Sequence, residues 1–599
     1  MSDGRAQGGH RGQGARGPVR HGGSRHQRRA RARALLGLGA AVVAIIVVAA
    51  VLVATQGPTP KASGVGRQAT PTTARVRTAA RSSKAPPVSH HSRPGSKPVP
   101  AANRTFLGPY GVESSAIVAQ NKLPGTSAWR LTGAHGSIEG FAGTTYAKAG
   151  DKVGLYISTD ARTYRVVAYR MGWYQGKGGR QVWASPTLAG HVQPTCPVTP
   201  STNMVSCANW SRSYTLKVTS AWPSGDYLLK MTGSGDQQGY IILTVWDPSS
   251  HSAYLVMTRS LTQQAWNPYG GYDLYEGQGP CILDSESYPP CNRARVVSFD
   301  RPYDWGNGAA DFLGNEYPLV EWAEEHGLDV SYCTDITVSE HPAVLLQHKA
   351  LLSLDHDEVW TNSERLAALH AATKGVNIVF FGAAPVLRHA RLQASPLGPD
   401  REEVDYRDSD EDPLNGVANP DEVTGNTWAS PPADWDEDLF VGEEYSGYLL
   451  PKAPFAAFVP YDSSSWIFKG TGLTATSSVP DVIASDIDHV DPSGPMPSDL
   501  QVLGHSPVPL SDAYTNQGEW DGDTYSDLTY YTYPHGGAGV FDSGTVNWLT
   551  ALVACSAKAC PATDIGKITG NLLAAFGQGP AGKLHPSVAN WQSVTPRGS

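Results

Sequence analysis

An imidazole and a carboxylate stand two residues apart, just after a run of apolar residues. The run is Ala350–Leu354, and His356 and Glu358 follow it in the sequence Leu-Asp-His-Asp-Glu. Side chains of an extended chain alternate between two sides, so His356 and Glu358 project to one side and Asp357 to the other. Such a pair can bind a metal ion or move a proton. A structural ion pair is the alternative interpretation.

An aromatic loop is the second candidate for chemistry. Residues Gln264–Tyr275 contain an Asn-Pro and a Gly-Gly pair, which favour turns, and they follow an apolar run at Ala253–Thr258. A loop at the end of a strand can place tyrosine hydroxyls over a ligand crevice. Aromatic packing beneath a rigid loop is the alternative.

Strands and helices alternate over residues 249–599. Four apolar runs predict strands: Ala253–Thr258, Leu328–Tyr332, Ala350–Leu354 and Val376–Phe381. Helices are expected at Ala309–His326, at His341–His348, and from the capping-box pattern Thr361-Asn-Ser-Glu364 to Gly375. The alternation predicts a mostly parallel α/β sheet with helices on both faces. Ligands of such sheets bind beyond the carboxyl ends of the strands, which is where His356 and Glu358 lie.

Residues 106–248 follow a different rhythm. Three runs alternate with period two, at Lys152–Thr159, Thr163–Tyr169 and Tyr227–Thr232, and turn residues separate them. This pattern predicts an antiparallel β-sandwich. Aromatic side chains in it bind sugar if they are exposed, and belong to the core if they are not.

Three segments of unusual composition precede the sandwich. Residues 1–33 are basic, residues 34–55 are uncharged and apolar, and residues 56–105 are rich in Pro, Ser, Thr and Arg. They predict a cytoplasmic tail, a single-pass transmembrane anchor and a disordered stalk. The positive-inside rule then places the folded domains outside the cell membrane. A cleaved signal peptide is the alternative to the anchor.

The cysteines bear on the cellular compartment, and the charge bears on the partners. Cys333 follows an apolar run and is expected to be a buried free thiol. The net charge of -8 combines this basic beginning with an acidic remainder, which argues against a nucleic-acid partner. The other six cysteines are close in sequence and are candidate disulfides of an oxidising compartment: Cys196/Cys207, Cys281/Cys291 and Cys555/Cys560.

Several motifs, taken together and in order, resemble the large-subunit family of N,N-dimethylformamidase. The resemblance covers nearly all of the chain from about residue 107 onward. A glycine-rich motif near the C-terminus, Gly536–Trp548, also resembles the family. The other motifs are Tyr169–Arg180, Tyr254–Thr258, Gln264–Tyr275, Tyr317–Trp322, Gly327–Asp335 and Leu354–Trp360.

The resemblance implies an amidohydrolase with a mononuclear iron, in a domain similar to glutamine amidotransferases. His356 and Glu358 match the family's His-x-Glu ligand pair, and we take Tyr275, at the end of the Gly-Gly-x-x-Leu-Tyr run, as the phenolate, with Tyr269 as the fallback. Two oxygens and one nitrogen suit iron, and zinc accepts the same donors. The metal would activate water for attack on a small amide.

Other residues receive weaker roles. Asn267 and Arg391 are candidates for substrate binding, and Glu519 is a weak candidate for the proton shuttle, because Asp357 points away. Ala384 stands where the family pattern has an asparagine. If that asparagine orients substrate or water, losing one donor costs on the order of 3 kcal/mol of transition-state stabilisation.

Two functions from different classes therefore remain open. One is a membrane-anchored, metal-dependent hydrolase of a non-peptide amide, with a small partner subunit or a homo-oligomer as conceivable assemblies. The other is a non-catalytic cell-surface protein that binds glycan or wall polymer and retains the fold. A thiol enzyme built on Cys333 is disfavoured, because no strand-to-helix elbow surrounds that residue.

Overall fold

The computed structural model describes the folded part of the chain and not its beginning. All described residues belong to one compact unit with bounds Pro98–Ser599. The predicted tail and anchor, and nearly all of the stalk, lie outside the described residues; within these residues, every helix is too short or too polar to cross a bilayer. The described ranges are 103–133, 137–278, 292–417, 419–491, 494–515, 523–555 and 559–594.

The first layer is the predicted β-sandwich. One sheet has the order β11 (Tyr214–Lys217), β5 (Lys152–Thr159), β3 (Ile138–Ala142). The other has the order β4 (Tyr146–Ala147), β13 (Gln238–Val245), β12 (Gly225–Gly233), β6 (Thr163–Met171), β7 (Gly179–Ala184), and β8 (Leu188–Ala189) also pairs with β6. Neighbouring strands are antiparallel except at β4 and β13. Alternate residues of β5 are buried, which is the period-two pattern of a strand with one face on a core.

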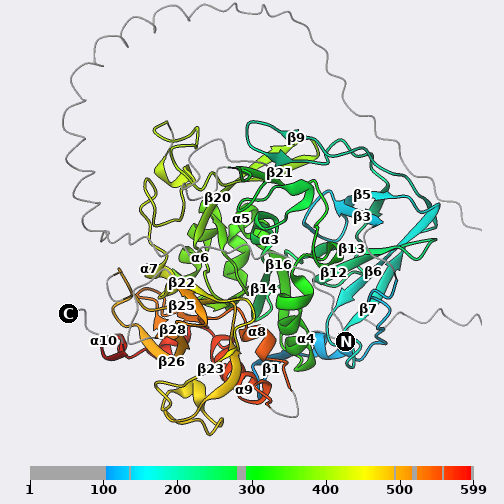
Figure 1. Cartoon of the computed structure of the whole chain (residues 1–599). Helices are drawn as coiled ribbons and strands as arrows, with labels where there is room; N and C mark the ends of the chain where they lie inside the picture. Colours follow the sequence, from blue (N-terminus) through cyan, green and yellow to red (C-terminus); the bar gives the residue numbers. More distant parts are fainter. Residues whose placement is uncertain are drawn as a thin grey trace, which may run out of the picture. The chain divides into compact units, whose positions relative to one another are not determined.

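A seven-stranded sheet forms the second layer (Figure 1). Its order is β16 (Val330–Thr334), β14 (Tyr254–Thr258), β17 (Ala350–Leu354), β19 (Asn377–Phe381), β29 (Gly539–Asp542), β28 (Asp523–Thr532), β26 (Gln501–Pro509). The first five strands are parallel, and β28 is antiparallel to both of its neighbours, β29 and β26. The mostly parallel sheet is therefore confirmed. Its predicted likeness to glutamine amidotransferases stays a prediction.

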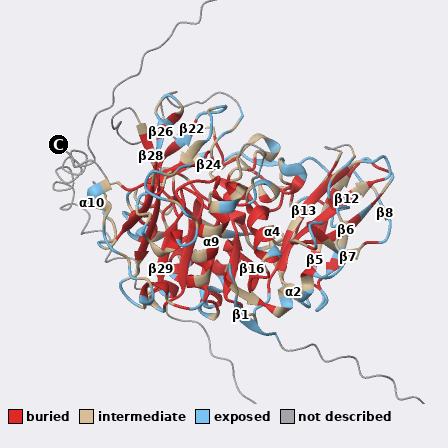
Figure 2. Ribbon diagram, turned by 90° about the horizontal axis from the view of Figure 1, so that it is seen from below, coloured by how far each residue is buried: buried red, intermediate tan, exposed pale blue. Residues whose placement is uncertain are grey.

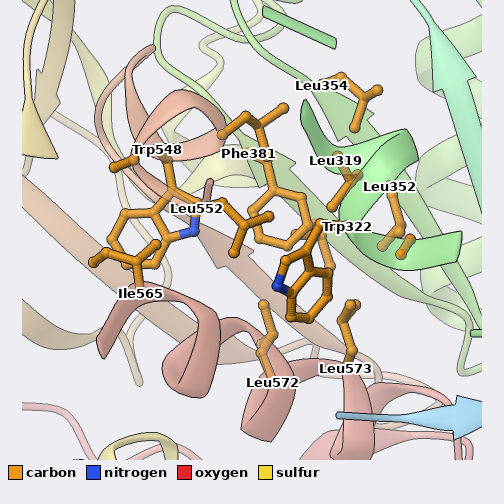
Figure 3. Close-up of a cluster of buried hydrophobic side chains, with 14 of the residues drawn as sticks. Leu319, Trp322, Leu352, Leu354, Phe381, Trp548, Leu552, Ile565, Leu572 and Leu573 are labelled. Carbon is orange, nitrogen blue, oxygen red and sulfur yellow. The ribbon is translucent and has the colours of Figure 1, made fainter. Parts of the chain in front are cut away.

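Helices cover both faces of this sheet, which leaves its strands buried (Figure 2). On one face Trp322, Leu572 and Phe381 share a core, and α4 (Tyr317–Glu325), α8 (Trp548–Ala551) and α9 (Ala562–Phe576) contribute to it (Figure 3). On the other face α5 (Asp335–Glu340) and α6 (Asn362–Thr373) pack against Leu351 and Phe380. Parallel strands buried on both faces read as continuous apolar runs, which is why the sequence located them well.

The predicted helices were right in place and partly wrong in extent. The helix expected at Ala309–His326 is a π-helical turn, Phe312–Glu316, followed by α4, which begins beside Pro318. A 3-10 helix, Pro342–Gln347, replaces the helix at His341–His348. The capping box at the start of α6 is confirmed, since Thr361 Oγ1 accepts a hydrogen bond from the Glu364 amide at 3.1 Å.

Smaller sheets that the sequence did not reveal flank the central one. They are β25 (Asp486–His489), β22 (Glu444–Leu449), β27 (Ala513–Thr515), and β15 (Val296–Ser298), β21 (Gly398–Val404), β20 (Arg388–Ser395), β18 (Val359–Thr361). Peripheral elements are β1 (Thr105–Leu107), β2 (Val112–Ser114), β9 (Val198–Thr199), β10 (Met204–Val205), β23 (Ala456–Phe458), β24 (Val479–Ile483), α2 (Ser115–Asn121), α3 (Ser260–Ala265), α7 (Asp438–Val441) and α10 (Trp591–Val594).

Two of the three predicted disulfides are present. Cys196 is bonded to Cys207, and Cys555 to Cys560. Cys333 is a buried free thiol, as expected. The third candidate pair, Cys281 and Cys291, lies outside the described residues.

Candidate functional site

The chain turns sharply where β17 ends. Asp355 has a positive φ of 57°, and its carboxylate forms an ion pair with the buried guanidinium of Arg259. A second nitrogen of Arg259 donates to the carbonyl oxygen of His356 at 3.2 Å. The backbone at this point is therefore a held turn and not the extended strand assumed from the sequence. The predicted convergence still occurs, since His356 Nε2 lies 3.5 Å from Glu358 Oε2.

The phenol of Tyr275 meets the same carboxylate oxygen. Its hydroxyl donates to Glu358 Oε2, and the indole nitrogen of Trp266 donates to that oxygen at 3.0 Å. The Tyr275 and Trp266 rings stack with their centroids 3.5 Å apart. The structure thus brings together the three side chains proposed as ligands, from the loop after β14 and the segment after β17. These side chains, Tyr275, His356 and Glu358, are called the trio below.

Charge at the site is arranged around Glu358. Burial acts to raise the pKa of this carboxyl, but His356 and Arg388 outweigh it and lower the pKa to about 2. Arg388 Nε donates to Glu358 Oε1 at 2.9 Å. Burial, together with the charge of Glu358, raises the pKa of Tyr275 well above its usual range. With no metal ion bound, the site therefore holds the ionised carboxylate of Glu358 and the neutral phenol of Tyr275.

A second acid faces the trio from a different sheet. Asp486 is the first residue of β25, and its Oδ2 lies 4.0 Å from His356 Nδ1. Burial raises the pKa of Asp486, and the hydroxyl of Tyr445 on β22 hydrogen-bonds to it. Neither residue could be predicted from the sequence, because both lie far beyond the His-x-Glu pair and follow no recognisable motif.

Two of the other predicted residues support the aromatic loop and do not face the trio. The hydroxyl of Tyr269 donates to Glu139 of the sandwich at 2.9 Å, so the fallback ligand points elsewhere. Asn267 is fully buried and donates to Gln264 Oε1 at 2.7 Å and to the Pro302 carbonyl at 2.9 Å. The Asn267 amide therefore holds the loop in its conformation. This role agrees with the alternative interpretation of the loop as packing beneath a rigid turn.

Arg391 is not brought to the site either. Arg391 makes a two-pronged ion pair with Asp412, at 2.6 and 2.9 Å, and donates to the Glu422 carbonyl. Arg388, at the start of the same strand β20, is the arginine that contacts Glu358. Glu519 lies outside the described residues.

Asp357 and Ala384 are the two remaining positions that the sequence singled out. Asp357 points away from the pair, as predicted, and accepts a hydrogen bond from Ser353 at 2.7 Å. Ala384 has a positive φ of 55°, and its amide donates to both oxygens of Asp488, at 2.9 and 2.8 Å. The backbone at this position is thus in a conformation that asparagine tolerates better than alanine.

The donor set can be compared with the preferences of metal ions. Among the described residues, His, Cys, Asp and Glu side chains alone do not form any group of three or more that could hold a metal ion. A metal held by His356 and Glu358 would take the phenol of Tyr275 as its third protein donor. A phenol oxygen, an imidazole nitrogen and an ionised carboxylate facing one another fit iron by donor chemistry.

The fold and site define an α/β-plus-β protein with a Tyr-His-Glu cluster at the carboxyl edge of its parallel sheet. A family model described as "N,N-dimethylformamidase beta subunit-like, C-terminal" matches residues 165–561, which is more than half of the chain. The chain belongs to this family. Its match begins inside the sandwich and extends past β29 of the central sheet.

Other comparisons add little. No curated protein matches this chain. Among solved structures, a Paenibacillus sp. cycloisomaltooligosaccharide glucanotransferase complexed with cycloisomaltoheptaose matches at 12% identity, over 22% of this chain and 18% of that chain. Its TM-score is 0.12, so the likeness carries no argument about fold or activity.

Proposed function

We propose that this protein is a metal-dependent amidohydrolase that splits the carbon–nitrogen bond of a non-peptide amide with water. The observation that supports the proposal is the meeting of Tyr275, His356 and Glu358 around one carboxylate oxygen. Family membership supports the same reaction class. The products would be a carboxylic acid and an amine.

Tyr275, His356 and Glu358 would hold a mononuclear iron, with zinc as the alternative. When bound, the metal supplies Lewis-acid polarisation of the amide carbonyl and a lowered pKa of bound water. The low pKa of Glu358 keeps this side chain charged for that role at any pH in the physiological range. Arg388 fixes the carboxylate through its other oxygen.

The chain's own acid–base chemistry would come from Asp486. This carboxylate lies beside His356 and is held by Tyr445. It would take a proton from the attacking water and deliver it to the amine nitrogen as the carbon–nitrogen bond breaks. Asp486 thus replaces Glu519 as the proposed proton shuttle.

The proposal is tested by release of amine from a panel of small formamides and acetamides, using full-length protein loaded with iron or zinc. Hydrolysis by wild type and by Tyr269→Phe, but not by Tyr275→Phe, is expected. A correctly folded, metal-loaded protein that releases no amine from any member would sink the proposal.

Ala384 favours a second candidate, a non-catalytic cell-surface protein that binds glycan or wall polymer. The family's side-chain amide is absent at this position, where only the backbone amide is engaged. This candidate would be supported if the full-length protein and its His356→Ala variant bind wall polymer equally well and no member of the amide panel is hydrolysed. An active amide panel with no polymer binding would remove it.

We also propose that residues 34–55 anchor the protein in the cell membrane and that the folded domains stand outside. The two disulfides support an oxidising compartment. Labelling of intact cells with a membrane-impermeant reagent tests this: modification of the folded domains is expected, and protection until lysis would contradict it. A small partner subunit or a homo-oligomer stays a prediction.

A further inference from the structure

Two tyrosines lie in a row with the proposed proton shuttle. In the three-stranded sheet β25–β22–β27, Asp486 is paired with Tyr448, and Tyr448 is paired with Tyr514. Residues directly opposite each other on antiparallel strands project from the same face of a sheet. The face that presents Asp486 to His356 therefore continues outward as two aromatic rings.

The row leads from the site to solvent. Neighbouring strands are roughly 5 Å apart, so the backbone of Tyr448 is about 5 Å, and that of Tyr514 about 10 Å, from the backbone of Asp486. The exposed fraction rises in the same order, from 20% for the Asp486 side chain to 38% for Tyr448 and 53% for Tyr514. The backbones of the two tyrosines are thus within about 10 Å of the backbone of Asp486, which is within reach of a substituent attached to the amide.

The rings form an open apolar surface. Tyr448 and Tyr514 stack with centroids 5.3 Å apart and planes 28° apart. Leu450, which follows the last residue of β22, is also exposed, at 39%. Within the described part of the chain, neither tyrosine hydroxyl forms a recorded hydrogen bond, unlike that of Tyr445, which is bound to Asp486.

We propose that Tyr448 and Tyr514 form a platform for an aromatic ring on the amide substrate, which makes the substrate an aryl-bearing amide larger than N,N-dimethylformamide. This inference rests on the proposed function, because it takes Asp486 and the trio as the reacting centre. Rings bind one another by offset stacking, and a row of stacked tyrosines offers such a ring its flat face. Stabilisation of the three-stranded sheet by a cross-strand aromatic pair is the competing explanation.

Substrate selectivity distinguishes the two explanations. The ratio of kcat/KM for N-benzylformamide to that for N-methylformamide is measured in the full-length, metal-loaded protein. Tyr514→Ala and Tyr448→Ala are expected to lower this ratio roughly tenfold, while Tyr514→Phe, which keeps the ring, preserves it. Tyr461→Ala is the matched control, since Tyr461 is 37% exposed and its hydroxyl faces Ser593. A ratio unchanged in both alanine variants, even with a lowered melting temperature, would overturn the platform.

Binding separates this inference from the proposed function. Saturation-transfer NMR with N-benzylformamide and N-methylformamide is run on His356→Ala, alone and combined with Tyr514→Ala. A benzyl signal that Tyr514→Ala removes supports the platform even if wild type hydrolyses neither compound, in which case only the proposed function fails. Equal signals with and without Tyr514 would overturn the platform, whatever the activity.

Discussion

The hydroxyl of Tyr275 donates a hydrogen bond to Oε2 of Glu358, although 83 residues separate the two in the chain. The topology of the sheet accounts for the contact. Strands β14 and β17 are parallel neighbours, so the loop after one and the segment after the other emerge side by side at the same edge. A phenol and a carboxylate contributed in this way are positioned by the rigid sheet and not by a flexible loop alone.

Replacing Tyr275 with phenylalanine should separate ligand chemistry from packing. The variant keeps the ring stacked on Trp266 but loses the oxygen that faces Glu358. Metal affinity should fall by more than about 100-fold, because losing a ligand costs more than losing one of its outer partners. Competition with a chelator measures this. Tyr269→Phe is the control on the same loop, and an equal loss of affinity in that variant would refute the assignment of Tyr275.

Replacing Asp486 with asparagine should slow the chemical step. General acid–base catalysis contributes roughly 10²–10⁴ in rate, so kcat should fall within that range while metal content is retained. Steady-state kinetics with a metal assay on the same sample checks both. Asp481→Asn, at an exposed position of β24, is the control. A kcat within about twofold of wild type in Asp486→Asn would remove Asp486 from the mechanism.

The trio could be predicted because its parts lie next to strong local signals. Ala350–Leu354 is an uninterrupted apolar run, and the strand has those bounds in the structure. The turn at Asp355 could not be predicted, because its left-handed backbone depends on the buried Arg259 contributed by the end of another strand. The meeting of His356 and Glu358 was therefore predicted, but the extended backbone on which the prediction rested is a turn at Asp355.

Asp486 and Arg388 show where sequence reasoning stops. Asp486 reaches the site through β25, a four-residue strand whose partner β22 lies about forty residues earlier. Pairings of that kind depend on tertiary contacts and leave no periodic pattern in so short a segment. The sequence predicts Arg391 from the family pattern, but it does not show that Arg391 pairs with Asp412 while Arg388, on the same strand, pairs with Glu358.

Ala384 offers a gain-of-stability experiment. A non-glycine residue at a φ of 55° costs roughly 1–2 kcal/mol relative to a residue free to adopt it. Ala384→Gly and Ala384→Asn should both relieve part of this strain and raise the melting temperature. Only the asparagine should also raise kcat, because only it adds an amide. Equal activity in the two variants would show that the family's asparagine has no catalytic role here.

Buried carboxyls beneath the site should make stability depend on pH. Burial raises the pKa of Asp542 to about 8, and burial together with Asp542 raises those of Glu443 and Asp488. Between pH 4 and 8 the folded state then holds protons that the unfolded state has released, so stability falls as pH rises. One such group gives a slope of at most about 1.4 kcal/mol per pH unit.

Asp542→Asn removes one of these titrations. Its amide oxygen can still accept from the Gly544 backbone, as the carboxylate does at 3.2 Å. Urea unfolding at several pH values should give a shallower slope in the variant and greater stability than wild type at pH 8. A variant with the wild-type slope would show that Asp542 titrates normally.

Metal content tests the central claim most directly. Elemental analysis of full-length protein, purified without added metal chelators and then reconstituted with iron, should find close to one equivalent in wild type and in Tyr269→Phe. His356→Ala and Glu358→Ala, verified as folded by circular dichroism, should each hold less than about a tenth of that, since each removes one of three donors. Wild type with no iron and no zinc, or both alanine variants with a full equivalent, would contradict a metal centre at Tyr275, His356 and Glu358.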